Sequence, residues 1–164
     1  MLQTPLLSHM SIFKQHRIYY RAVFTWLLFI PVVFLNGTIR EVVYKQYMGD
    51  LAAHQVSTMF ASALFIILAY YLLRHHLRSV GSRSLFTIGL MWLVMTVLFE
   101  FGLGLFVGSS WDKLIYDYNI LEGRIWILFL VTLLATPYII KKWKPSNTNK
   151  FQRASYSRVP SGSN

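Results

Sequence analysis

The stretch LFTIGLMWLVMTVLFEFGLGLFV, residues 85–107, decides the fold class because it carries a single charged residue, Glu100. At about 1.5 Å per residue, a helix of this length is long enough to cross a hydrocarbon core about 30 Å thick. Its apolar residues do not alternate with polar ones, as those of an outer-membrane β-strand would. The stretch therefore predicts a transmembrane α-helix.

Three further apolar runs extend this pattern along the chain, at residues 22–39, 51–73 and 125–140. Since backbone amides in lipid must be hydrogen-bonded within the protein, each run is expected to be helical. The sequence thus predicts an all-α integral membrane protein whose membrane domain is a bundle of four transmembrane helices. The helical spans are expected at about residues 22–41, 51–73, 85–107 and 121–140.

Composition excludes several other classes of protein. The chain has 164 residues, of which 55% are hydrophobic and 13% are charged, whereas soluble domains average about 25% charged residues. Disordered chains are poor in apolar residues, so that class does not fit either. The absence of cysteine rules out disulfides, a thiol nucleophile and metal sites built on cysteine ligands.

The formal net charge of +10 is unevenly distributed. Basic residues without any acid precede the first span, join the second to the third, and follow the fourth. The remaining basic residues share the other two links with all the acids except Glu100. By the positive-inside rule, both termini are expected in the cytoplasm, in a multi-pass protein of the inner (plasma) membrane.

These observations divide the chain into three parts. Residues 1–20 form a basic cytoplasmic segment, residues 21–141 the transmembrane domain, and residues 142–164 a basic tail. The tail is too polar to fold alone and is expected to be mobile. Its cations are expected to lie near anionic lipid head groups at the cytoplasmic face. A role in orientation already explains the charge, so no nucleic-acid partner is expected.

Counting residues from the inner boundary of each span places polar side chains of all four helices about 21–29 Å up, near the outer surface of the hydrocarbon. The second outer link, residues 108–124, is expected to fold over this layer, and a short interfacial helix is expected within it. The candidate polar cluster comprises Asn36, Arg40, Glu41, His54, Ser57, Glu100, Asp117, Asn119 and Arg124.

Glu100 is the member of this cluster that most needs a partner. It is flanked by apolar residues, so an ionised carboxylate would be costly there without a counter-charge. Arg124 and Arg40 are the cations expected at its level. The alternative is a protonated Glu100, which burial would favour.

The cluster allows three interpretations. The first, which we favour from sequence, is a structural or accessory membrane subunit whose polar network fixes the packing of a homo-oligomer or of a complex with a partner membrane protein. The second is a proton-linked site, or one that binds and transports a small ligand or lipid. The third is an enzyme at the membrane face that acts on a lipid, with His54 as general base.

The enzymatic interpretation has little support in the sequence. The chain contains no HExxH, Gly-x-Ser-x-Gly or glycine-rich phosphate motif, so no catalytic residue is assigned. His54, Glu41 and Glu100 are weak candidates for metal ligands, because nearby arginines would repel a cation. We therefore expect no metal and no cofactor.

Overall fold

The computed structural model describes residues 4–116 and 118–143, and within these ranges all regular secondary structure is helical. The all-α prediction is confirmed for this part of the chain. In chain order the elements are α1 (Thr4–Ile39), the π-helical segment η1 (Arg40–Tyr44), α2 (Lys45–Leu77), α3 (Ser82–Phe106), α4 (Trp111–Tyr116), the 3₁₀ turn η2 (Ile120–Glu122) and α5 (Trp126–Lys142).

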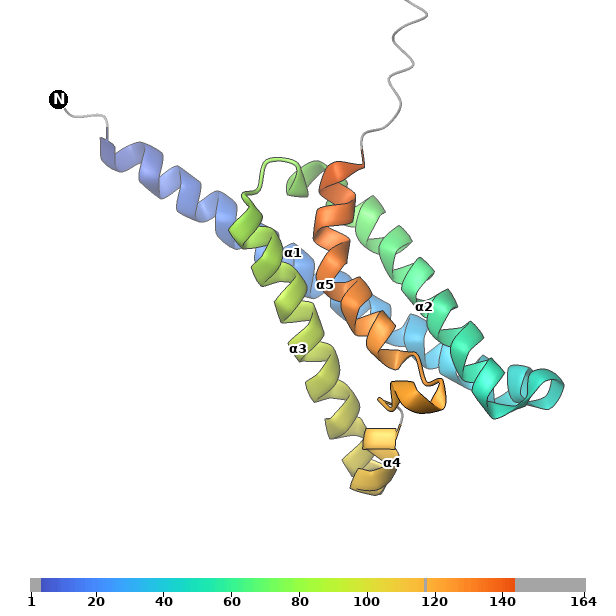
Figure 1. Ribbon diagram of the computed structural model, residues 1–164. Coiled ribbons are helices and arrows are strands. Elements are labelled where there is room, and N and C mark those ends of the chain that lie inside the picture. The colour runs from blue at the N-terminus through green and yellow to red at the C-terminus, as the bar shows by residue number, and fades with distance from the viewer. Residues whose placement is uncertain (1–3, 117, 144–164) are drawn as a thin grey trace, which may run out of the picture.

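Two helical stretches, His16–Leu77 and Ser82–Phe106, are long and apolar enough to cross a membrane. The first is folded back on itself, so that α1 and α2 form a hairpin (Figure 1). Gly49 lies in the reversal with φ 76° and ψ 171°, a conformation that side chains make very costly. A glycine at this position allows one long apolar stretch to become two antiparallel arms.

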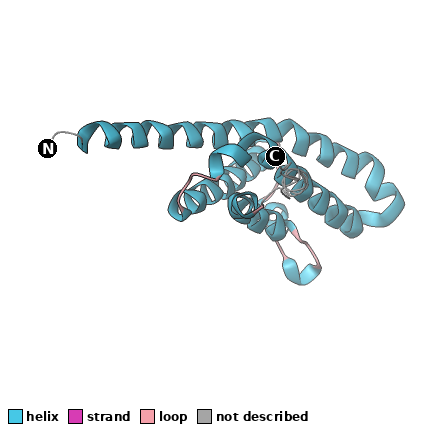
Figure 2. Ribbon diagram, turned by 90° about the horizontal axis from the view of Figure 1, so that it is seen from above, coloured by secondary structure: helices cyan, strands magenta, loops and turns pink. Residues whose placement is uncertain are grey.

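The long helices form two layers. Helix α5 lies between α2 and α3 and packs against both, while α1 crosses one face of this layer (Figures 1 and 2). The first part of α1 extends beyond the other helices (Figure 2). We call the end of the bundle formed by residues 40–50, 108–116 and 118–125 the acidic end. The opposite end, where the α2–α3 link meets the end of α5 (Figure 1), is the basic end.

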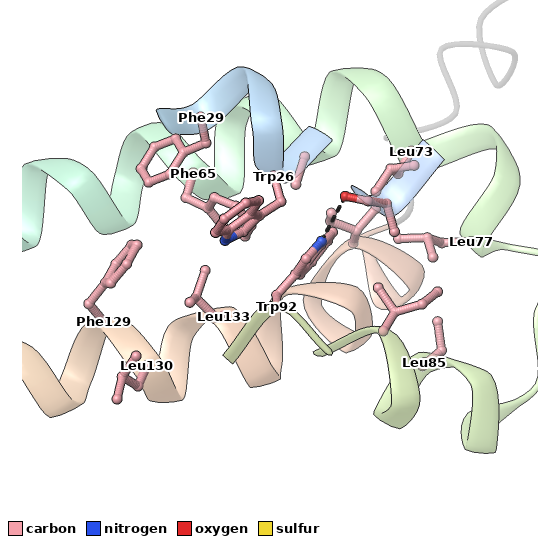
Figure 3. Packing of buried hydrophobic residues seen from close by; sticks show 14 of the residues in the cluster. Trp26, Phe29, Phe65, Leu73, Leu77, Leu85, Trp92, Phe129, Leu130 and Leu133 are labelled. Atoms are coloured by element: carbon pink, nitrogen blue, oxygen red, sulfur yellow. Dashed lines mark hydrogen bonds between the residues drawn. The ribbon is translucent and has the colours of Figure 1, made fainter. Parts of the chain in front are cut away.

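The core is an aromatic cluster to which each long helix contributes (Figure 3). The ring centre of Phe65 on α2 lies 4.9 Å from that of Phe29 on α1 and 5.0 Å from that of Trp92 on α3, both edge to face. Phe129 on α5 lies 6.3 Å from Phe65 and 5.9 Å from Phe29. Such ring pairs contribute about 0.5–1.5 kcal/mol each beyond their buried area. The cluster therefore fixes all four helices at one level.

Two closer contacts hold the helices together toward the basic end. The indole Nε1 of Trp92 donates a hydrogen bond to the carbonyl oxygen of Ala22 at 2.8 Å, which ties α3 to α1 (Figure 3). Gly89, one turn before Trp92, lies against the backbone of Leu134, so α3 and α5 approach more closely than a side chain would allow.

The element boundaries differ from the expected spans at two places. Helix α1 already begins at Thr4 and so includes most of the segment expected to precede the first span. Helix α5 begins at Trp126, later than the expected residue 121, because Gly123 takes a left-handed conformation (φ 80°) that ends η2. The short helix expected in the second outer link is present as α4. Most of the expected tail lies outside the described residues.

We predict that Gly89→Ala destabilises the bundle by about 1–3 kcal/mol, because the added methyl group must push the α5 backbone away. Its Cβ would lie 2.5 Å from the carbonyl oxygen of Leu134. Gly102→Ala on the same helix is the matched control, since its Cβ would meet nothing within 4 Å. The control should be neutral or stabilising by up to about 1 kcal/mol. Thermal unfolding in detergent measures both, and equal melting temperatures would contradict the close approach.

Candidate functional site

A cavity of about 590 Å³ lies between α1, α2, α3 and α5, on the acidic side of the aromatic cluster. Its volume falls within the range of about 300–1,000 Å³ typical of small-molecule sites. The wall on α1 extends from Trp26 through Asn36 to Glu41 in η1. At 1.5 Å per residue this corresponds to a depth of about 20 Å along the helix.

The deep part of the cavity is apolar and mainly aromatic. Trp26 and Phe29 of α1 lie opposite Phe129 of α5, and Phe99 of α3 closes the side. Trp26 is held in place by an edge-to-face contact with Phe99 at 5.7 Å and by a hydrogen bond from its Nε1 to Thr96 Oγ1 at 2.9 Å. These contacts use the polar atom of the indole, so the surface presented to the cavity is apolar.

One wall of the upper cavity is a polar stripe on α2. His54, Ser57 and Thr58 are all buried, and the hydroxyls of Ser57 and Thr58 donate to the carbonyl oxygen of His54 at 3.0 and 2.8 Å. The amide Nδ2 of Asn36 on α1 donates to the carbonyl oxygen of Ser57 at 2.9 Å. The stripe thus faces the bundle, and Asn36 joins the two arms of the hairpin beside it.

Glu100 on α3 faces two neutral donors. Its Oε2 accepts a hydrogen bond from the hydroxyl of Tyr118 at 2.6 Å and another from the indole Nε1 of Trp126 at 2.6 Å. These bonds connect α3 to the second outer link and to the first residue of α5. Arg124, the cation expected to pair with Glu100, donates to Asp50 Oδ2 at 2.7 Å. The sequence pointed to Arg124 and Arg40 as partners of Glu100, and it did not predict the bonds from Tyr118 and Trp126.

Arg40 and Glu41 reach the mouth of the cavity from η1. The amide of Lys45 donates to the carbonyl oxygen of Arg40, which is the i to i+5 bond that defines a π-helix. Such segments are rare and are found frequently at functional sites. The guanidinium of Arg40 lies 3.4 Å from His54 Nδ1 and 3.1 Å from Glu41 Oε1.

A chain of ion pairs leads from this mouth across the acidic end. Lys45 Nζ lies 2.5 Å from Glu41 Oε2 and 2.9 Å from Asp50 Oδ1, and Asp50 also pairs with Arg124. The hydrogen bond from Lys45 is the main cause that holds the pKa of Asp50 below its usual value. We call Arg40, Glu41, Lys45, Asp50 and Arg124 the ion-pair chain. Its members alternate in charge, so each has an opposite neighbour.

The ion-pair chain ends in contacts that attach the second outer link to the hairpin. Within the link itself, the guanidinium of Arg124 lies over the ring of Tyr116, 4.6 Å from its centre. Gln55 Nε2 on α2 donates to the carbonyl oxygen of Gly123 at 2.9 Å. The link is therefore held on both sides, by Asp50 and Gln55 of α2 and by Glu100 of α3.

The structure brings most of the predicted cluster together around the cavity. Arg124 is not among the residues that line the cavity and pairs with Asp50, and the side chain of Asn119 accepts a hydrogen bond from the amide of Leu121 and so caps η2. Asp117 lies outside the described residues. The predicted residues that line the cavity are Asn36, Arg40, Glu41, His54, Ser57 and Glu100.

Sequence reasoning missed two of the site's polar contributors, Tyr118 and Trp126. Tyrosine and tryptophan are typical of the membrane interface. No periodic pattern in the sequence predicts that these two side chains point into the bundle. The available indication was their position on either side of Arg124, which the sequence had placed at the level of Glu100. Among the residues that the structure describes, no three His, Asp or Glu side chains are grouped so as to hold a metal ion. His54, Glu41 and Glu100 therefore do not form a metal centre together.

Comparison with models of known protein families, with curated proteins and with solved structures finds no match for this chain. The function must therefore be argued from the site itself.

We predict that Tyr118→Phe, which removes only the hydroxyl that donates to Glu100, lowers the free energy of unfolding by about 1–2 kcal/mol. Tyr47→Phe is the matched control, because Tyr47 is 83% exposed at the acidic end. Thermal unfolding in detergent compares the two variants with the parent protein. A Tyr118→Phe variant as stable as the control would show that this hydrogen bond does not hold the second outer link.

Proposed function

We propose that this chain is a multi-pass protein of the inner (plasma) membrane with four spans and both termini in the cytoplasm, and that its cavity binds an amphipathic molecule from the outer leaflet. The observation that carries the proposal is the two-part lining of the cavity. Aromatic side chains line its deep end, and the charged side chains of Arg40 and Glu41 line its mouth.

The distribution of charge supports this topology. The helical stretches His16–Leu77 and Ser82–Phe106 are long enough for three crossings, because the first is a hairpin. Helix α5 runs alongside them through the bundle and would supply the fourth. In the described ranges, Lys and Arg at the basic end have no acidic residue among them. This asymmetry favours placing the basic end in the cytoplasm.

The lining supports an amphipathic ligand rather than a polar one. Most of the cavity wall is apolar, and its depth of about 20 Å is more than half of a hydrocarbon core about 30 Å thick. A single acyl chain fits such a space along its length. The charged residues that line the cavity are Arg40 and Glu41 at the mouth and Glu100 on α3. A head group at the mouth and a chain in the deep end would each meet matching chemistry.

The side of the cavity between α1 and α3 supports entry from the lipid. These two helices diverge toward the acidic end (Figure 1). Two residues that line the cavity along this side are exposed, Phe34 on α1 at 48% and Val107 at the end of α3 at 72%. In a bilayer these edges would face acyl chains. A lipid-like molecule could therefore enter sideways without first crossing water.

The ion-pair chain favours a second candidate, an accessory subunit whose polar network serves packing alone. It joins the hairpin to the second outer link through Asp50 and Arg124, which is what a structural network would do. Half-exposed ion pairs of this kind contribute only about 0–1 kcal/mol each. Because these ion pairs stabilise the fold so little, they support a structural role less strongly than the cavity supports a binding role.

The absence of native cysteine makes the topology testable with single-cysteine variants. We predict that Gln46→Cys, at the acidic end, reacts with a membrane-impermeant maleimide in intact cells. Ser79→Cys, in the α2–α3 link, should react only after the membrane is permeabilised. Both parent side chains are exposed, so the two variants are matched in accessibility within the protein. The reverse pattern would overturn the orientation, and labelling of both in intact cells would overturn the four-span arrangement.

Ligand binding can be followed by quenching of tryptophan fluorescence with a brominated single-chain amphiphile. Trp26 and Trp126 line the cavity, so we predict saturable quenching that is largely lost in the double variant Trp26→Phe/Trp126→Phe. The matched double variant Trp111→Phe/Trp143→Phe should retain it, because both of these indoles are 56% exposed and lie outside the cavity.

Mass spectrometry of the purified protein, with the bound amphiphile counted, supplies a second readout that does not depend on tryptophan. Quenching that never saturates, together with no bound amphiphile, would contradict the binding function. If a partner membrane protein is also retained through purification, that result would favour the accessory-subunit candidate.

A further inference from the structure

We propose that the head group of the bound amphiphile is an oxyanion, a phosphate or a carboxylate, and that it binds to the guanidinium of Arg40 in exchange for Glu41. This inference rests on the proposed ligand-binding function and specifies the chemistry of the ligand. It is carried by the position of Arg40 in the cavity and by the contacts that surround it.

Arg40 is placed where an entering head group would come to rest. It lines the cavity at the mouth, above the apolar walls, and its side chain remains 29% exposed. A guanidinium has five N–H donors in a planar fork that matches the oxygens of a carboxylate or phosphate. The contacts of Arg40 are with Glu41 and with His54 Nδ1 at 3.4 Å, which leaves capacity for further acceptors.

Glu41 can release Arg40 without losing its other counter-charge. Its Oε1 contacts Arg40, while its Oε2 is held by the ammonium of Lys45 at 2.5 Å. The pair between Arg40 and Glu41 joins neighbouring residues and involves a carboxylate that is 48% exposed. Exposed pairs of this kind contribute little to stability. An incoming oxyanion would therefore displace a weak internal partner and leave Glu41 paired.

The other charged groups around the cavity disfavour a cationic head group. Both carboxylates that line it are already engaged, Glu41 by two cations and Glu100 by the hydroxyl of Tyr118 and the indole of Trp126. Binding a cation at Glu41 would place it beside both Arg40 and Lys45. Arg40 is the charged group of the cavity whose present counter-ion can most easily be exchanged.

The test compares four probes that share one alkyl chain and differ in head group. They are hexadecyl phosphate, palmitate, hexadecanol and hexadecyltrimethylammonium, and each displaces the brominated amphiphile from the full-length protein in detergent. We expect the two anions to bind more tightly than the alcohol by about tenfold or more, as a charge-assisted contact would give. The ratio of phosphate to palmitate affinity distinguishes a phosphate from a carboxylate ligand.

Variants of the two exchanging residues provide the decisive comparison. Arg40→Gln should weaken both anions by about tenfold and leave hexadecanol unchanged, and Arg40→Lys should lie between, because it keeps the charge but not the fork. Glu41→Gln should strengthen anion binding, because the internal competitor is removed. The matched controls are Arg78→Gln and Glu122→Gln, at exposed positions outside the cavity, and both should bind like the parent protein.

The possible results separate this inference from the function on which it rests. If hexadecanol binds as tightly as the anions and Arg40→Gln has no effect, the oxyanion inference is wrong while the binding function stands. Preference for the ammonium probe, or weaker anion binding by Glu41→Gln, would also overturn it. If none of the probes binds to the parent protein, both proposals fail.

Discussion

The contact of the Phe65 ring with aromatic rings from the other three long helices is the interaction on which the rest of the structure depends. Phe29, Trp92 and Phe129 approach it from α1, α3 and α5 with ring centres 4.9, 5.0 and 6.3 Å away. In lipid, helices gain little from burying apolar surface against one another, so close packing and hydrogen bonds must hold them. The rings fix the level at which all four helices converge, and the cavity begins where that convergence ends.

The two sides of this level are held by different forces. Toward the basic end, the helices are in direct contact. Gly89 allows the close approach of α3 and α5, and Trp92 donates a hydrogen bond from α3 to α1. Toward the acidic end, the contacts between helices and links become polar, as in the bonds of Asn36 to Ser57 and of Gln55 to Gly123. A polar side chain can join two helices that lie farther apart than helices in contact at a glycine. The helices can therefore diverge toward the acidic end and still be held in a fixed arrangement. The cavity follows from this change in the kind of contact.

The helical class followed from the sequence, because long apolar runs without polar alternation determine it. The pairing within the cluster did not. Glu100 accepts from Tyr118 and Trp126 because Gly123 ends η2 and delays the start of α5 to Trp126. That geometry depends on the backbone of an irregular link. Outside a helix the rise per residue is not constant, so counting residues does not give the position of a side chain along the bundle. The π-helical turn at Arg40 was also beyond prediction, since no residue in it demands that conformation.

The packing beneath the cavity favours a binding site over a passage through the membrane. Phe65 and Trp92 are both fully buried between the cavity and the basic end, and Leu73, Leu85 and Leu133 continue the same core (Figure 3). An amphiphile could cross to the basic end only if these rings separated, and their contacts hold all four helices together. For the amphiphile proposed above, the charged mouth and the closed aromatic base would allow one orientation, with its head group at the acidic end. Under the proposed topology, a site that orients its ligand in one leaflet would suit recognition or presentation of a lipid better than its transfer.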